Sequence, residues 1–282
     1  MKEFDTSAEP SWCPGCGDFG IQAALKNAFS ELKLKKEEIV MVTGIGCGSK
    51  ITHWIDTYGI HSIHGRSIPI ATGVKLANHK LKVIAVGGDG DGYGIGLNHF
   101  MQIQRRNVNI TYIVQNNQIY GLTKGQTSPT SEKGYESHTT PHGNLEEPVN
   151  PMSIAIAGGA SFVARGYVAH LRHLTDLIKQ AIMHEGFSFV DVFQPCVTWN
   201  KHNTYGYFKT RVYELESANY KPINKVKAYE KSLEMEEKIP IGLFYKEDKP
   251  TYESGLKQIK KTPLVKQDIS KIDITRTLEN HY

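Results

Sequence analysis

Four cysteines are the residues whose type and spacing most directly suggest chemistry. Cys13 and Cys16 form a C-x-x-C pair in WCPGCG, Cys47 lies in GIGCGSK, and Cys196 follows a Gln-Pro pair. Four thiolates suit either tetrahedral zinc or a [4Fe–4S] cluster, and their spacing alone slightly favours zinc. The N-terminal segment is polar and has no apolar stretch typical of an export signal, so we expect a metal site here and not two disulfides.

A loop of glycines and aspartates is the second candidate site. The segment GGDGDGYGIG places Asp89, Gly90 and Asp91 directly after an apolar run. Glycines let the backbone approach a diphosphate closely, and the free N–H groups at a following helix start attract an anion. Asp89 offers a hard oxygen for Mg²⁺, which bridges phosphates well. Turns of this composition are common, so the loop alone fits an ordinary turn equally well.

A second polar loop follows at a distance that makes the pair informative. VQNNQIYG offers the side chain of Asn117 and the carbonyl group of Ile119. The 25 residues between Gly90 and Asn116 are enough for one helix and one strand. We therefore expect the two loops to lie side by side at one edge of a sheet.

The elements that must position these loops alternate along the chain. Short apolar runs rich in Val and Ile predict buried strands, and stretches with helical spacing predict helices between them. This alternation predicts an α/β fold with a doubly wound, mainly parallel sheet and helices on both faces. Ligands bind beyond the carboxyl ends of such strands, in loops that begin here near Gly44, Gly88, Asn116 and Phe193. The strands are expected at 38–44, 81–88, 109–116, 161–166 and 187–193, and the helices at 67–80, 97–107 and 171–184.

The pattern weakens after about residue 205. Residues 205–216 suggest a short helix, 240–248 an isolated strand, and the chain from Asp248 onward is polar and rich in lysine. We therefore predict an α/β domain over residues 1–205 that carries the cofactor and cluster ligands. An irregular C-terminal extension, 206–282, is expected to pack on that domain or on a partner subunit.

Composition excludes some classes of function. The net charge of +4 is only mildly basic, and much of the excess lies beyond Lys221. No recognisable nucleic-acid-binding module or basic stripe is present, so no nucleic-acid partner is expected. No window approaches the roughly 20 apolar residues of a membrane span. These features predict a cytoplasmic protein.

Long motifs carry a resemblance to a known family. The pairing of GDG with a later Asn-Asn resembles the site that thiamine-diphosphate enzymes share. WCPGCGDFG, GIGCGSK, HGRSIPIATGVKLAN, GGDGDGYGIG and NNQIYGLTKGQTSPT together resemble the β subunit of 2-oxoacid:ferredoxin oxidoreductases, most closely the 2-oxoglutarate type. The similarity runs from about residue 11 to 207, with a looser match at 243–245. It implies coenzyme A-dependent oxidative decarboxylation of a 2-oxoacid to acyl-CoA and CO₂, with electrons passing through a [4Fe–4S] cluster to ferredoxin.

The loops offer further candidate residues, and the resemblance implies the ligand sets. From their positions in the loops, His64 and Arg66 are candidates for contacts with the phosphates and substrate, and we hypothesise that Lys124, with Lys50 as a second cation, attracts the distal carboxylate of 2-oxoglutarate. Each of the four has an ordinary structural or solvated role as its alternative. The [4Fe–4S] ligands would be Cys13, Cys16, Cys47 and Cys196; the Mg²⁺ ligands Asp89, Asn117 and Ile119; and the thiamine diphosphate lining Ile45, Gly46, Cys47, Gly48, His64, Gly65, Gly90, Asp91, Gly121 and Leu122.

One expected residue is missing from these loops. Thiamine enzymes use a glutamate against the aminopyrimidine ring, and in the resembled family it comes from the α subunit, so this chain alone should be inactive. Three alternatives stay open: a cluster-free thiamine-dependent lyase with structural zinc, a zinc-stabilised nucleotide-binding or scaffold module, and a pyruvate, branched-chain or broad-specificity enzyme within the family.

Overall fold

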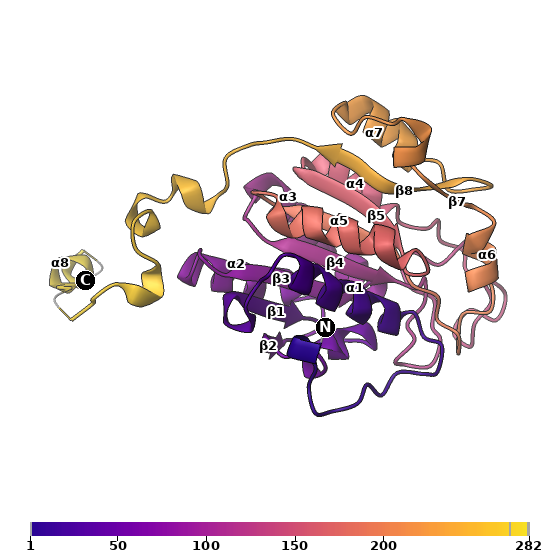
Figure 1. The fold of residues 1–282 in the computed structure, drawn as a ribbon, viewed down its shortest axis with the longest axis horizontal. Helices are drawn as coiled ribbons and strands as arrows, with labels where there is room; N and C mark the ends of the chain where they lie inside the picture. Colours follow the sequence, from indigo (N-terminus) through magenta and orange to yellow (C-terminus); the bar gives the residue numbers. More distant parts are fainter. Residues whose placement is uncertain (1, 271, 281–282) are drawn as a thin grey trace.

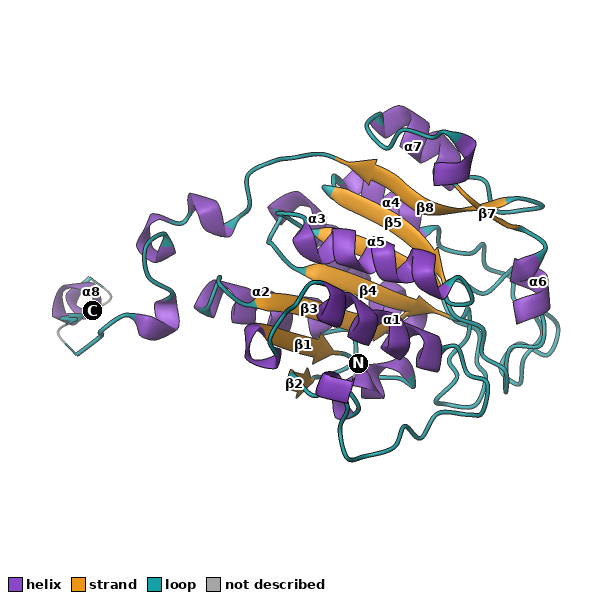
Figure 2. Ribbon diagram, in the orientation of Figure 1, coloured by secondary structure: helices purple, strands orange, loops and turns teal. Residues whose placement is uncertain are grey.

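The computed structural model describes residues 2–270 and 272–280, which build an eight-stranded sheet between two layers of helices (Figure 1; Figure 2). The strand order is β2-β1-β3-β4-β6-β5-β8-β7. All neighbouring strands pair in parallel except β5 and β8, which are antiparallel. The strands are β1 Ile39–Thr43, β2 Tyr58–His61, β3 Lys82–Gly88, β4 Thr111–Asn116, β5 Phe162–Tyr167, β6 Ser188–Phe193, β7 Val212–Glu214 and β8 Ile239–Lys246.

Helices cover both faces of the sheet, which explains why the central strands are apolar throughout. Helices α1 (Asp18–Glu31) and α5 (Leu171–Met183) pack side by side on the face turned to the viewer in Figure 1. The opposite face carries α2 (Ser67–Ala77), α3 (Leu97–Arg106), α4 (Pro151–Gly158) and α7 (Lys225–Ser232). Two short helices, α6 (Tyr205–Lys209) and α8 (Thr275–Glu279), lie in the C-terminal part.

The predicted doubly wound fold is confirmed, with all five predicted strands and all three predicted helices present. Residues 205–216 were expected to be one helix, but they form α6 and then β7. The strand expected at 240–248 is not isolated, because β8 pairs with β5 on one side and β7 on the other. Part of the C-terminal extension therefore packs into the sheet itself. Strand β2 escaped prediction because all four of its residues are exposed and give no apolar run.

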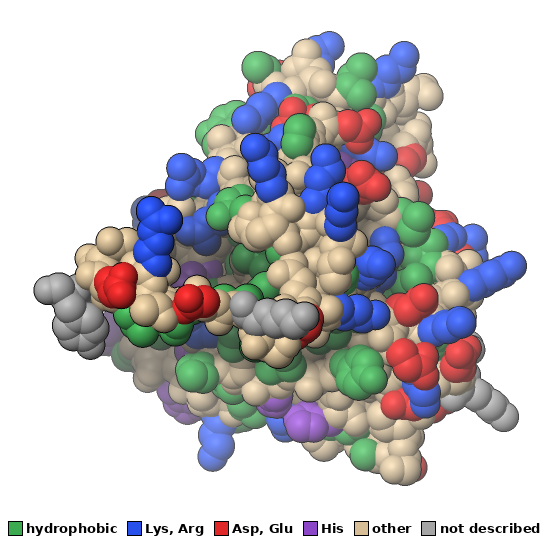
Figure 3. Space-filling view, turned by 90° about the vertical axis from the view of Figure 1, so that its left-hand side faces the viewer, with side chains coloured by type: hydrophobic (Ala, Val, Ile, Leu, Met, Phe, Trp, Pro, Cys, Tyr) green, Lys and Arg blue, Asp and Glu red, His purple; other side chains and the backbone are tan. Residues whose placement is uncertain are grey.

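The chain beyond β8 is first hydrogen-bonded to the domain and then extends away from it. The side-chain amide of Asn107 donates to the carbonyl oxygens of Lys249 and Pro250, and the carboxylate of Glu253 accepts from the backbone N–H of Asn109. The following segment runs away from the sheet as an arm (yellow in Figure 1). In the described residues, no helix has the length and apolarity to cross a membrane. Lysine and arginine side chains on the face of Figure 3 are spread among acidic and hydrophobic ones.

The strand order places the predicted loops together. Strands β1, β3, β4 and β6 are consecutive neighbours, and all four are parallel. Their carboxyl ends therefore meet at one edge of the sheet, as predicted from the alternation of strands and helices. The loops at 44–48, 89–92, 117–122 and 194–196 all start from this edge.

Candidate active site

A cavity of about 210 Å³ lies between these loops at the carboxyl edge of the sheet. All the residues predicted to line the cofactor border this cavity except Gly65, whose backbone N–H donates to Asp91 in the cavity wall. All three predicted Mg²⁺ ligands line it as well. The cavity is bordered by Asp18, Ile45, Gly46, Cys47, Gly48, His64, Gly88, Asp89, Gly90, Asp91, Gln115, Asn117, Ile119, Tyr120, Gly121, Leu122, Thr123 and Gln194.

Asp91, in the loop after β3, is hydrogen-bonded to the loops that follow β1 and β2. Its Oδ1 accepts hydrogen bonds from the backbone N–H of Ile45 (2.9 Å) and of Gly65 (2.7 Å), and it lies 2.8 Å from Nδ1 of His64. The side chain is buried, so these partners replace the water that the carboxylate would otherwise bind. Asp91 therefore joins the ends of β1 and β2 to the loop after β3, a role that the sequence did not indicate.

The predicted Mg²⁺ ligands offer a suitable set of oxygens. Burial raises the pKa of Asp89 to about 6, although the Ser128 hydroxyl and the Thr130 hydroxyl (2.8 Å) both donate to its Oδ2. A bound cation would relieve the cost of burying this charge. Asn117 lies opposite, with its side-chain oxygen 3.1 Å from the backbone N of Ile119. One carboxylate, one amide and one carbonyl are hard donors, so the set fits Mg²⁺ with the remaining positions left to phosphate and water.

Two glycines allow close packing around the cavity. A Cβ on Gly90 would lie 2.2 Å from the ring of Tyr120, whose hydroxyl donates to the Gly90 carbonyl oxygen at 3.1 Å. A Cβ on Gly48 would lie 1.7 Å from the Gln115 amide oxygen. A side chain at either position would displace these neighbours, both of which line the cavity, so the shape of the cavity depends on the two glycines.

The four cysteines are free thiols that converge beside the cavity. Burial, with smaller contributions from Asp18, Cys196 and Cys13, raises the pKa of Cys47 to about 11, and burial likewise raises that of Cys16. A Cβ on Gly121 would lie 3.5 Å from the Cys196 sulfur and 3.9 Å from that of Cys47. In residues 2–270 and 272–280, no group of three or more Cys, His, Asp or Glu is close enough to hold a metal ion. The chemistry of the donor set, four thiols, suits a sulfur-ligated metal or cluster.

Three buried polar residues in the cavity wall were missed by sequence reasoning. Asp18, Gln115 and Gln194 are each about 1% exposed, and each has one side-chain oxygen without a hydrogen-bond partner. Burial raises the pKa of Asp18 to about 7, which the Cys16 thiol and the charge of Lys50 partly oppose. Buried acceptors without partners call for hydrogen-bond donors from whatever fills the cavity. The position of Asp18 in CGD and of Gln194 in QPC, beside two cysteines, was the available signal.

The predicted basic residues are placed unequally. His64 lines the cavity, and Lys50 is close enough to influence Asp18. Arg66 lies outside the lining and donates to the carbonyl oxygens of Gly65 (3.2 Å) and Ile95 (3.4 Å). Lys124 is exposed on the 117–125 turn, with a left-handed backbone (φ 80°), and also lies outside the lining.

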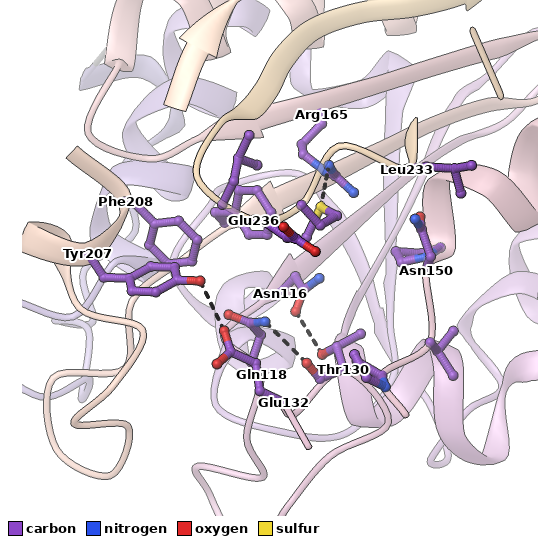
Figure 4. A pocket seen from close by; sticks show the side chains of 16 residues that line it. Asn116, Gln118, Thr130, Glu132, Asn150, Arg165, Tyr207, Phe208, Leu233 and Glu236 are labelled. Atoms are coloured by element: carbon purple, nitrogen blue, oxygen red, sulfur yellow. Dashed lines mark hydrogen bonds between the residues drawn. The ribbon is translucent and has the colours of Figure 1, made fainter. Parts of the chain in front are cut away.

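A second cavity, of about 390 Å³, lies behind the loop after β4 (Figure 4). It is lined by Asn116 and Gln118, whereas Gln115 and Asn117 face the first cavity. Its wall includes Arg165, which pairs at 3.3 Å with Asp191; both are fully buried. Asn116 donates to Asp191, and the Thr130 hydroxyl, with one proton to donate, lies within hydrogen-bond distance of both Asn116 Oδ1 (2.9 Å) and Asp89 Oδ2 (2.8 Å). The chain of polar contacts thus supports Asp89 from behind.

Comparisons with known proteins agree with this architecture. A family model described as the C-terminal TPP-binding domain of thiamine pyrophosphate enzymes matches residues 17–192. A second model, the C-terminal part of the pyruvate ferredoxin oxidoreductase beta subunit, matches residues 196–261. A doubly wound sheet with this pair of loops at its carboxyl edge defines a thiamine-diphosphate-binding α/β domain of an enzyme.

Relatives narrow the class to one family. Subunit beta of 2-oxoacid:ferredoxin oxidoreductase 1 from Aeropyrum pernix is 47% identical over 92% of this chain and 85% of its own length. The 2-oxoglutarate oxidoreductase subunit KorB of Mycobacterium tuberculosis is 46% identical over 71% of this chain and 53% of its own length. The chain therefore belongs to the β subunits of the 2-oxoacid:ferredoxin oxidoreductases, and the predicted family is confirmed.

A solved structure shows the same fold. The 2-oxoglutarate:ferredoxin oxidoreductase from Magnetococcus marinus, with 2-oxoglutarate, coenzyme A and succinyl-CoA bound, aligns with a TM-score of 0.91 at 35% identity. The alignment covers 100% of this chain and 95% of that chain.

Proposed function

We propose that this chain binds thiamine diphosphate with Mg²⁺ and a [4Fe–4S] cluster. With an α subunit, it would catalyse coenzyme A-dependent oxidative decarboxylation of a 2-oxoacid, preferably 2-oxoglutarate, with ferredoxin as electron acceptor. The observation that carries this proposal is the convergence at Gly121. The position that a Cβ would take on Gly121 lies within 4.0 Å of the sulfurs of Cys47 and Cys196 and of the Asn117 amide nitrogen. A sulfur-ligated redox centre and the magnesium-holding loop would therefore share one wall.

The residues of the cavity suit this reaction. When bound, thiamine diphosphate supplies the electron sink that lets the carboxylate of a 2-oxoacid leave as CO₂. Asp89, Asn117 and the carbonyl of Ile119 would hold the cation. His64, whose Nδ1 is fixed by Asp91, would present its Nε2 to the substrate as a hydrogen-bonding group.

The cavity also supports the need for a partner. Among the described residues, none of those lining it is a glutamate. We therefore infer that the acid needed at the aminopyrimidine ring comes from the α subunit and that this chain alone is inactive. The names of the Mycobacterium and Magnetococcus relatives support 2-oxoglutarate as the substrate. An enzyme for pyruvate or for a broad range of 2-oxoacids is the alternative within the family.

The deciding experiment is iron and sulfide analysis with a visible spectrum on the anaerobically purified complex with the α subunit. We expect about four iron and four sulfide per β chain, with absorbance near 400 nm that 2-oxoglutarate plus coenzyme A bleaches. Loss of iron from the cluster would also bleach the absorbance, so the iron content is measured again after the reaction. One zinc per chain without colour would instead identify a cluster-free thiamine-dependent lyase.

The substrate preference gives a separate prediction. If Lys124 attracts the distal carboxylate, Lys124→Ala raises KM for 2-oxoglutarate by about tenfold, the effect of one lost hydrogen bond to a charged group, with little change for pyruvate. Steady-state kinetics with both substrates measures this. Lys133→Ala is the matched control. Lys133 is also an exposed lysine between β4 and α4, but it pairs with Glu147. An unchanged KM for 2-oxoglutarate would remove Lys124 from substrate binding.

A further inference from the structure

Gln194 contacts a cysteine sulfur through its side-chain amide and also lines the cavity. Its Nε2 donates to the sulfur of Cys16 at 3.2 Å. Its Oε1 is buried without a partner, and the residue lines the cavity. A thiolate that ligates a cluster has no proton to donate, so it can accept a hydrogen bond from the amide nitrogen but cannot pair with the amide oxygen.

The backbone holds this side chain in place. Gln194 directly follows β6, and its N–H donates to the carbonyl oxygen of Asn116 at 3.0 Å, which extends the pairing of β6 with β4. Gly17 supplies the space, because a Cβ there would lie 2.7 Å from Cγ of Gln194. The glycine after the second cysteine of the C-x-x-C pair thus lets the glutamine reach the sulfur. A buried contact built on rigid strands keeps its geometry when ligands change.

A hydrogen bond to this sulfur has a defined electrostatic effect. Reducing a thiolate-ligated cluster adds negative charge to it, and an N–H donor at a ligand sulfur stabilises that charge. The other neighbour of the same sulfur is the Asp18 carboxylate at 3.4 Å. In this contact the carboxylate is the hydrogen-bond acceptor, and it carries no positive charge. In the described structure, the Gln194 amide is therefore the donor that favours the reduced state at Cys16.

We propose that Gln194 is a positioning residue that raises the reduction potential of the cluster through Cys16. The proposal rests on the proposed function, since it requires the cluster to be present. The Oε1 atom of the same amide is buried without a partner. A hydrogen-bond donor that reached it would polarise the amide and strengthen its N–H.

The test is a redox titration of the cluster, followed by electron paramagnetic resonance, in the purified complex with the α subunit. Gln194→Leu keeps the size of the side chain but removes the donor, and Gln194→Glu keeps its shape while replacing the donor with an acceptor. We expect the ratio of reduced to oxidised cluster at a fixed potential to fall by about tenfold in Gln194→Leu, or about 59 mV for one electron. The shift in Gln194→Glu should be at least as large.

The control is Gln104→Leu, the same substitution at a fully buried glutamine of α3 whose amide has no partner. It should leave the potential of the cluster unchanged. A wild-type complex without iron and sulfide would contradict the proposed function. A wild-type complex with its cluster, together with unshifted potentials in both Gln194 variants, would overturn only the role of Gln194. Loss of iron from both Gln194 variants, with iron retained in Gln104→Leu, would also overturn it by assigning the contact to cluster assembly.

Discussion

Asp91→Ala is expected to lower the free energy of unfolding by about 3–5 kcal/mol and to abolish binding of thiamine diphosphate. The substitution leaves the backbone N–H groups of Ile45 and Gly65 and the Nδ1 of His64 without their shared acceptor. Each buried donor left unpaired costs about 1–3 kcal/mol. Because these donors belong to two separate loops, both would move away from the loop after β3.

Asp91→Asn is the matched comparison. An asparagine keeps an acceptor oxygen at the Oδ1 position, where all three contacts are made, so most of the stability should return. Its new amide group would lie where Oδ2 is buried against Gly44 and Gly87, which leaves a residual cost. Thermal unfolding of the complex and titration with thiamine diphosphate measure both effects. Wild-type stability in Asp91→Ala would show that the loops are held together by other contacts.

Asp89→Asn is expected to weaken Mg²⁺-dependent binding of thiamine diphosphate by more than about 100-fold, the upper end for residues that only support a metal ligand. Thr130→Val should fall within about 10–100-fold. Its hydroxyl lies within hydrogen-bond distance of Asp89 and of Asn116 and can donate to either one, so it would orient the ligand without touching the cation. Calorimetric titration at several Mg²⁺ concentrations would separate the two variants.

The control for this pair is Thr123→Val. Thr123 also lines the cavity, but its hydroxyl donates to Gln126 and makes no contact with Asp89. Binding should remain as in the wild-type protein. Equal losses in Thr130→Val and Thr123→Val would point to a general disturbance of the 117–131 segment instead of an effect on the cation.

Asp89 also determines how the binding of Mg²⁺ should depend on pH. Without a cation, the raised pKa of Asp89, about 6, means that its carboxyl gains a proton as the pH falls through 6. A cation must displace that proton, so the apparent affinity for Mg²⁺ should fall below pH 6, by up to about tenfold per pH unit. In Asp89→Asn this part of the slope should disappear.

The sequence allowed the edge of the site to be predicted but not its interior. The loops after β1, β3, β4 and β6 lie together because these strands are parallel and their carboxyl ends meet at one edge of the sheet. The contacts of Asp91 join backbone groups 46 and 26 residues away in the sequence, and no local pattern encodes such pairs. Gln115 and Gln194 are polar residues that the same pattern would place equally well on a surface.

The charged pair of the second cavity was overlooked for a similar reason. Arg165 and Asp191 lie within apolar runs, and only the pairing of β5 with β6 brings them opposite each other. A charged residue inside a strand that is otherwise apolar was the available signal, because such a residue must find a partner when it is buried. The antiparallel insertion of β8 beside β5 had no comparable signal, since the apolar run at 240–248 specifies neither a neighbour nor a direction.

The backbone at Gly121 has a consequence for how this site can change during evolution. A Cβ at Gly121 would lie 3.5 Å from the sulfur of Cys196, 3.9 Å from that of Cys47 and 4.0 Å from the amide nitrogen of Asn117. A methyl group there would therefore reach van der Waals contact with all three groups. A substitution at this position would be felt by the thiols and by the cation-holding loop together. We expect sequence variation to be tolerated better at the outer rim, where Leu122 and Lys124 lie exposed.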